Sequence, residues 1–163
     1  MNIYSKEKEI LEDGTIIYKK EIISMEDYDI IEENNIIKLK PKKITIKIDN
    51  IDKLQEYNFN SSIIVECYLN NKRPSKNKYA SILNDIYELI GDGTKIIKNT
   101  LLNVKTTNNI DKGFYCISKL GISIQRADAK NTFKEIVNQC LTNKYSLNIE
   151  IKLKDGKNFI FNV

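Results

Sequence analysis

The motif closest to a catalytic signature is Glu150-Ile151-Lys152, which has the acid-x-Lys spacing of a carboxylate-and-lysine nuclease centre. Such a centre uses carboxylates to bind a divalent metal and lysine to orient water or stabilise charge. Asp128 lies upstream at a suitable separation for the second acid. However, alternating charges on a Lys-rich strand produce Glu-x-Lys by chance, and Asp128 is better explained as a helix N-cap. A nuclease at Glu150 and Lys152 therefore ranks third among our interpretations.

Other catalytic and metal chemistry is limited by composition. The chain contains no His, which excludes Ser-His and Cys-His pairs and every His-containing metal site. The segment 91–95, Gly-Asp-Gly-Thr-Lys, is too short for a phosphate-binding P-loop and follows a predicted helix, not a strand. The acidic run 26–33 lacks EF-hand spacing and is typical of a solvated surface. We therefore predict a protein without catalytic residues, metal or cofactor.

Basic residues gather in two short segments, 38–47 and 72–78. Together these clusters would suit phosphate groups, and Tyr68 and Tyr79 beside the second one could stack on unpaired bases. Lysines also protect sheet edges from unwanted pairing. A nucleic-acid-binding module is accordingly the second interpretation. The candidate residues are Lys38, Lys40, Lys42, Lys43, Lys47, Lys72, Arg73, Lys76 and Lys78.

The composition makes the total charge weak evidence for an anionic partner. Ile, Lys and Asn number 29, 24 and 20 of the 163 residues, a bias typical of an A/T-rich genome such as that of a low-GC bacterium or its phage. The net charge of +4 follows partly from this bias. Arginine is rare: the sequence contains only Arg73 and Arg126, whereas Lys is common. These two positions therefore point to a need for the planar guanidinium group, which Lys cannot replace. Arg126 is either a packing or salt-bridge residue, with Asp128 as a partner, or a contact for an anion or a carboxylate.

The distribution of charge is more informative than its total. Residues 1–35 hold ten acids and four lysines, a net −6, so the remainder must carry +10 to give the total of +4. Opposite charges of this kind can meet between subunits, and Ile-rich strands with Pro41 at an edge suit strand-mediated contacts. Our first interpretation is a non-catalytic interaction or assembly protein, such as an adaptor, inhibitor, immunity or phage-type structural component. Its partner would be a protein or a second copy.

The expected compartment is the cytoplasm. The three cysteines are far apart, odd in number and flanked by apolar residues, which predicts reduced packing residues. The first ten residues lack the apolar region of a signal peptide, and no apolar run approaches the length of a membrane span. We expect no membrane association.

Strands are predicted mainly from alternation and turn residues. Asp13-Gly14 and Asp155-Gly156 each lie between strand-like runs and predict a hairpin at either end of the sequence. Ile44, Ile46 and Ile48 alternate with polar residues, while 61–69 is apolar nearly throughout and predicts a central strand. Segment 113–125 predicts two strands that meet near Leu120-Gly121. Residues 25–35 fit either a short helix or a strand with a loop.

Two helices have clear apolar stripes, at 76–90 and 128–141, with Ser75 and Asp128 as N-caps and Gly91 as the end of the first. Segment 95–106 is ambiguous, with a slight preference for helix. The predicted fold class is α+β, with a mostly antiparallel sheet of five to seven strands and two or three helices on one face. We predict one domain over 1–163, with 1–35 either part of it or an acidic appendage.

Overall fold

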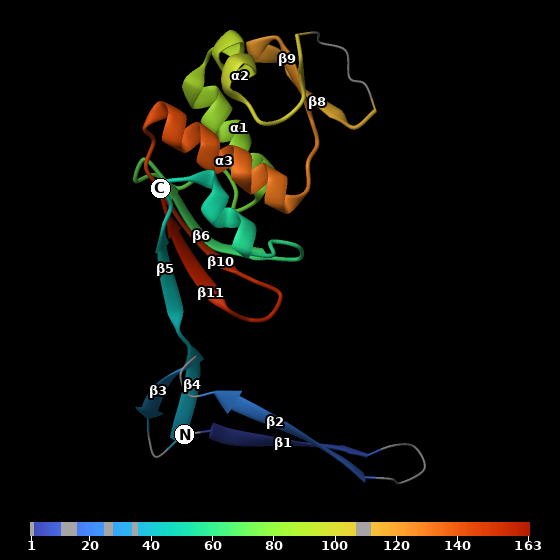
Figure 1. Ribbon diagram of the computed structural model, residues 1–163, viewed down its shortest axis with the longest axis vertical. Coiled ribbons are helices and arrows are strands. Elements are labelled where there is room, and N and C mark those ends of the chain that lie inside the picture. Colours follow the sequence, from blue (N-terminus) through green and yellow to red (C-terminus); the bar gives the residue numbers. More distant parts are fainter. Residues whose placement is uncertain (1, 11–15, 25–27, 34–35, 107–111) are drawn as a thin grey trace. The chain divides into compact units, whose positions relative to one another are not determined.

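The computed structural model describes residues 2–10, 16–24, 28–33, 36–106 and 112–163. The chain divides into two compact units, 1–42 and 43–163. Strands and helices are both present, as the predicted α+β class requires (Figure 1). The prediction of one sheet with five to seven strands is wrong, because the strands form small sheets of two, four, two and three strands.

The N-terminal unit contains two antiparallel ribbons. In the first, β1 (Asn2–Ile10) pairs with β2 (Ile16–Ser24), which confirms the predicted hairpin pairing. The predicted Asp13-Gly14 turn lies outside the described residues. In the second ribbon, β3 (Tyr28–Glu33) pairs with β4 (Ile36–Pro41). The described part of the acidic segment is therefore a strand, with Tyr28 opposite Pro41 at the end of the ladder.

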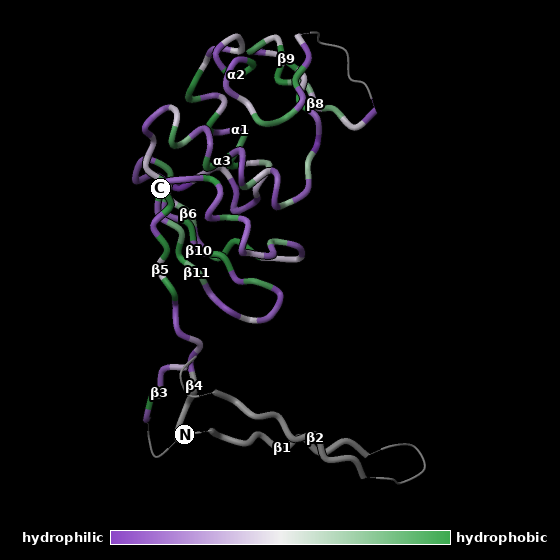
Figure 2. Tube along the Cα trace, in the orientation of Figure 1, coloured by the Kyte–Doolittle hydropathy of each residue, from purple (hydrophilic) through white to green (hydrophobic). Residues whose placement is uncertain are grey.

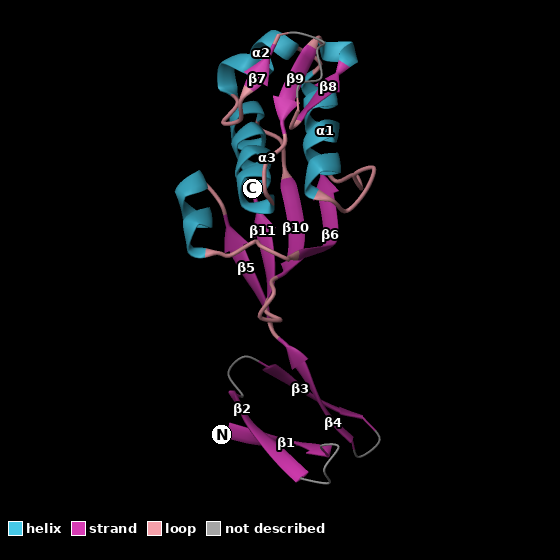
Figure 3. Ribbon diagram, turned by 90° about the vertical axis from the view of Figure 1, so that its right-hand side faces the viewer, coloured by secondary structure: helices cyan, strands magenta, loops and turns pink. Residues whose placement is uncertain are grey.

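The C-terminal unit has a four-stranded sheet in the order β5-β11-β10-β6 (Figure 3). Its strands are β5 (Lys43–Lys47), β6 (Ile63–Leu69), β10 (Leu147–Lys152) and β11 (Asn158–Asn162). The pairing of β10 with β11 confirms the second hairpin, and Gly156 takes the positive φ of 88° that its turn requires. The pairing of β5 with β11 is parallel.

The position predicted for β6 was wrong, because this strand lies at an edge of the sheet. Its apolar residues are not all buried. Ile64, Cys67 and Leu69 belong to the core, whereas Ile63 and Val65 are 65% and 46% exposed. A nearly continuous apolar run suggests burial on both faces, but here half of it points away from the core.

Three α-helices are present among the described residues: α1 (Tyr79–Ile90), α2 (Gly93–Asn99) and α3 (Ala129–Asn143). Gly91 ends α1 and Asp128 caps α3, as predicted. Ser75 does not cap α1, which begins three residues later than expected, after Lys78. Instead, the Ser75 backbone N–H donates to the Asp85 carboxylate at 2.7 Å. A short 3-10 helix, η2 (Ile51–Glu56), precedes β6.

Segment 95–106 is helical only at its start, within α2, and then forms β7 (Val104–Lys105). The two strands predicted in 113–125 are β8 (Phe114–Ile117) and β9 (Ile122–Gln125), which pair antiparallel around the 3-10 turn η3 (Ser118–Leu120). The order of this small sheet is β7-β9-β8. Gly121 adopts a φ of 64° and ends η3.

The core of the C-terminal unit lies between its helices and one face of the four-stranded sheet. Figure 2 shows hydrophobic stretches along β6, β10 and β11. Phe133 on α3 contacts Phe59 and Phe161, with ring centroids 4.9 and 5.5 Å apart. Tyr79 on α1 packs on the same Phe133 ring. The Cys67 and Cys140 thiols are buried, and the Cys116 thiol is partly buried. Among the described helices, none has the length and apolarity that a membrane span requires.

Candidate functional site

The sheet face opposite the helices carries Lys43 of the predicted basic residues, together with Glu150 and Lys152 of the predicted nuclease motif. We call it the outer face and define it by Lys43, Glu66, Tyr68, Glu150 and Lys152. Strand alternation places it there, because the intervening residues of β6, β10 and β11 point into the core. The outer face therefore combines acids, bases and an aromatic ring.

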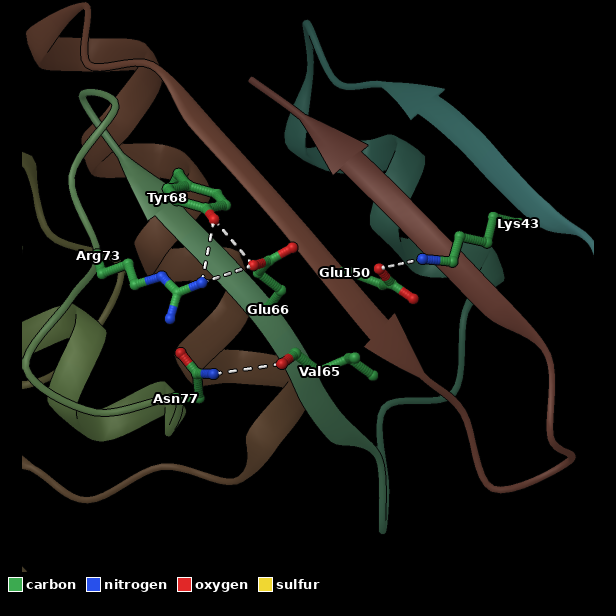
Figure 4. Close-up of polar contacts among 7 residues, drawn as sticks. All are labelled: Lys43, Val65, Glu66, Tyr68, Arg73, Asn77 and Glu150. Atoms are coloured by element: carbon green, nitrogen blue, oxygen red, sulfur yellow. Dashed lines mark hydrogen bonds and ion pairs between the residues drawn. The ribbon is translucent and has the colours of Figure 1, made fainter.

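Glu66 and Glu150 are direct partners across the β6–β10 ladder. Opposed like charges destabilise a sheet unless counter-ions lie close by. The Lys43 ammonium is 2.8 Å from the Glu150 carboxylate. Since Lys43 lies on β5 and Glu150 on β10, this side chain spans the intervening strand β11 (Figure 4). The Glu150 side chain is only 9% exposed, so the ion pair compensates for a nearly buried charge.

Glu66 has a different counter-ion. Arg73 donates to the Glu66 carboxylate at 3.1 Å and to the Tyr68 hydroxyl at 3.3 Å. The Tyr68 hydroxyl also donates to Glu66 at 2.8 Å, which closes a three-residue cluster (Figure 4). The hydrogen bond to Tyr68 and the charge of Glu66 raise the pKa of the Arg73 guanidinium. Arg73 also lies over the Tyr68 ring, 5.7 Å from its centroid.

A β-bulge interrupts the ladder between β6 and β10 next to this cluster. The ladder pairs Glu150 with Glu66 but Ile151 with Ile64, so Val65 is the extra residue. Asn77 donates its amide to the Val65 carbonyl at 3.3 Å, which satisfies an acceptor at the sheet edge (Figure 4). Ile63 and Val65 thus form a small exposed apolar patch beside the charged cluster.

The two predicted basic segments do not merge within the C-terminal unit. Lys43 and Lys47 lie on β5, and residues 72–78 follow β6, at opposite edges of the four-stranded sheet. Three strand spacings separate these edges, roughly 14 Å. Lys72 and Arg73 line a surface hollow together with Asp85 and Glu88. Lys76 and Lys78 are exposed on the same loop.

The remaining predicted cations lie elsewhere. Lys38 and Lys40 are on β4, and Lys42 follows it, all within the N-terminal unit. Arg126 follows β9 and is exposed. Its predicted salt bridge with Asp128 is not formed, because the Asp128 carboxylate accepts from the Asn131 backbone N–H at 2.7 Å and from the Asn131 amide at 3.1 Å.

The structure separates the residues of the predicted nuclease centre. Glu150 lies on the outer face, whereas Asp128 caps α3 in the helical layer on the other side of the sheet. Glu150 is bound by Lys43 instead of facing a second carboxylate with room for a metal. Within the described ranges, no group of three or more Cys, Asp or Glu side chains could hold a metal ion.

Tyr79 does not have the exposure that base stacking requires. Its ring packs against Phe133, and its hydroxyl lies 2.7 Å from the Ser62 hydroxyl. Burial raises the pKa of Tyr79 to about 12. Of the two tyrosines predicted to stack on bases, only Tyr68 lies on the outer face, and Arg73 already contacts its ring.

Sequence reasoning missed two groups. Glu66 alternates with the core residues of β6, and this outward position was the available signal. Glu135 on α3 is fully buried and accepts from the Tyr87 hydroxyl at 2.9 Å, the Leu101 backbone N–H at 2.8 Å and the Gln139 amide at 2.8 Å. Glu135 lies beside the apolar stripe of α3 and four residues before Gln139, so both side chains project from the same side of the helix. This spacing was the available signal.

Searches of family models, curated proteins and solved structures found no match to this chain.

Proposed function

We propose that this protein acts without catalysis, as an assembly protein that binds further copies of itself. The observation that carries the proposal is the construction of residues 1–42 from two separate two-stranded ribbons. An isolated two-stranded ribbon is marginally stable in water and leaves backbone groups unpaired at both edges. Such a unit gains stability when another chain supplies a surface or a further strand.

Charge supports a second copy as the occupant. Residues 1–35 carry a net −6 and the rest of the chain +10, so the surfaces of two copies are complementary. Asp29 and Glu32 are exposed on β3, and Lys47 and Lys72 are exposed in the C-terminal unit. In the proposed assembly, the acidic N-terminal segment of one copy contacts the basic segments 38–47 and 72–78 of the next.

A charge-swap experiment tests this contact. The double variant Lys47→Glu/Lys72→Glu should lose self-association, because acidic and basic surfaces would become alike. Mixing it with Asp29→Lys/Glu32→Lys should restore binding between the two variants. The control Lys98→Glu/Lys119→Glu makes the same charge change at exposed lysines outside both segments and should self-associate normally. Equal loss in the control, or no recovery on mixing, would contradict the specific contact.

Nucleic-acid binding is the second candidate, favoured by Lys43 and Lys152 on the outer face, by Lys47 on β5 and by Arg73 on the loop after β6. Glu66 and Glu150 oppose it, because they pair with two of these cations and would repel phosphates. Fluorescence anisotropy with labelled single- and double-stranded oligonucleotides, at about 50 and 200 mM salt, distinguishes the two candidates. Binding that weakens steeply over this range would support nucleic acid, and no binding at the lower salt would remove it.

A further inference from the structure

The C-terminal unit contains a cavity of about 390 Å³ that lies away from the outer face. Helix α1 contributes Leu83 and Asn84 to its wall, and β8 contributes Tyr115. Arg126 and Thr132, on either side of the start of α3, and Gln125 at the end of β9 add further polar groups to the lining. A volume of this size is within the range of small-molecule sites, roughly 300 to 1,000 Å³.

Arg126 is the charged residue of this lining. Within the part of the chain that the structure describes, its guanidinium has no ion pair or side-chain hydrogen bond. The other arginine, Arg73, is fully engaged with Glu66 and Tyr68. The backbone N–H of Arg126 donates to the Gly113 carbonyl at 2.7 Å, which fixes the main chain below a free side chain. A planar cationic fork therefore lines the cavity with no anionic partner among the described residues.

Two further polar groups remain available in the same lining. The side-chain oxygen of Asn84 is buried and accepts no hydrogen bond from the residues that the structure describes. A buried acceptor without a partner costs stability, on the order of 1–3 kcal/mol, so its retention calls for an explanation. Burial and the charge of Glu135 raise the pKa of Tyr115 to about 12, and the charge of Arg126 acts in the opposite direction. Tyr115 therefore stays a neutral hydrogen-bond donor beside Arg126.

The lining also limits what can bind. Leu83, Leu102, Ala80 and Ala127 provide apolar walls. One cation matches a singly charged group, and the buried Glu135 near Tyr115 disfavours a dianion. We propose that this cavity binds a small organic carboxylate, with its carboxylate on the Arg126 fork and its apolar body between Leu83 and Leu102. An Arg guanidinium donates to both carboxylate oxygens at once, which an ammonium group cannot reproduce.

The test is an NMR titration of the ¹⁵N-labelled full chain with benzoate, phenylacetate and hexanoate, and with the matched amides benzamide, phenylacetamide and hexanamide. At least one carboxylate should bind saturably and shift the backbone amide resonances of Asn84, Tyr115 and Thr132. Its amide should bind about tenfold more weakly, a difference of about 1.4 kcal/mol. No saturable binding of any carboxylate up to about 20 mM, a range that covers weak millimolar complexes, would overturn the proposal.

Variants assign the site. Arg126→Gln should weaken carboxylate binding about tenfold or more, and Arg126→Lys should bind with intermediate affinity, since it keeps charge but loses the fork. Arg73→Gln, the only other arginine position, should bind like the unmodified chain. Unfolding curves serve as the control for the fold of Arg126→Gln, which we expect to be retained because the Arg126 side chain is exposed. Unchanged binding by Arg126→Gln would contradict the assignment, and tighter binding of phenyl phosphate than of benzoate would contradict the carboxylate class.

Discussion

Glu66 and Glu150 face each other across the β6–β10 ladder, and each is neutralised by a cation from a different part of the chain. Lys43 reaches Glu150 from the edge strand β5, and Arg73 reaches Glu66 from the loop after β6. Two acids that would repel each other thus connect both edges of the sheet. The same two ion pairs occupy Lys43 and Arg73, two cations that the sequence predicts to bind phosphate.

The two ion pairs should differ in strength. Glu150 is nearly buried, whereas the side chains of Arg73 and Glu66 are 74% and 45% exposed. Double-mutant cycles in urea should give a coupling of about 1 kcal/mol or more for Lys43 with Glu150, and a clearly smaller coupling for Arg73 with Glu66. Equal coupling energies would show that burial of Glu150 does not strengthen its ion pair.

The buried Glu135 should be among the most sensitive polar positions. Its carboxylate joins Tyr87 on α1, the Leu101 backbone and Gln139 on α3. Glu135→Ala leaves several buried donors unpaired and should lower the free energy of unfolding by about 3 kcal/mol. The exposed Glu88→Ala on α1 serves as the control and should change it by less than about 0.5 kcal/mol. Similar losses in both variants would contradict a structural role for the network.

Stability should decline at alkaline pH. Burial raises the pKa of Tyr79 and Tyr115 from 10.0 to about 12, and of Cys67 and Cys140 from 9.0 to about 12. Between these values the unfolded chain loses protons that the folded chain keeps, so the free energy of unfolding falls as pH rises. Urea unfolding at a series of pH values should show this contribution intact below pH 9 and lost progressively up to about pH 12. Tyr115→Phe should flatten the decline, and an unchanged slope in that variant would refute its contribution.

Thiol reactivity should divide the cysteines. Cys67 and Cys140 are buried, and their raised pKa keeps them protonated at neutral pH. We expect a thiol-specific disulfide reagent to leave both unmodified in the native chain and to modify all three cysteines in denaturant. Cys116→Ser, which removes the partly buried thiol, isolates the other two. Rapid labelling of native Cys116→Ser would mean that the core opens readily around β6 and α3.

Local sequence signals predicted local structure well. Asp128 and the apolar stripe after it defined α3, Gly121 separated β8 from β9, and Asp155-Gly156 marked the β10–β11 turn. Each of these features depends on residues a few positions apart. Helix α1 begins at Tyr79, later than predicted, because Ser75 resembles an N-cap in the sequence. In the structure the Ser75 backbone N–H donates to the Asp85 carboxylate instead.

Long-range pairing was the part that sequence patterns could not supply. The parallel pairing of β5 with β11 joins distant segments, and no local signal sets it. The same holds for the Glu66–Glu150 register, which depends on the bulge at Val65. Arg126 was noticed because Arg is rare, yet its cavity is assembled from α1, β8 and the start of α3. Such sites require the tertiary fold.

Self-association through complementary charge should be visible in sedimentation velocity of the full chain. Runs at about 0.01 M and 1 M salt span Debye lengths from about 30 Å to about 3 Å. We expect species heavier than the 18.9 kDa chain at the lower salt and a shift toward the monomer at the higher salt. A single monomeric species at both salt concentrations, unchanged as protein concentration rises, would contradict it.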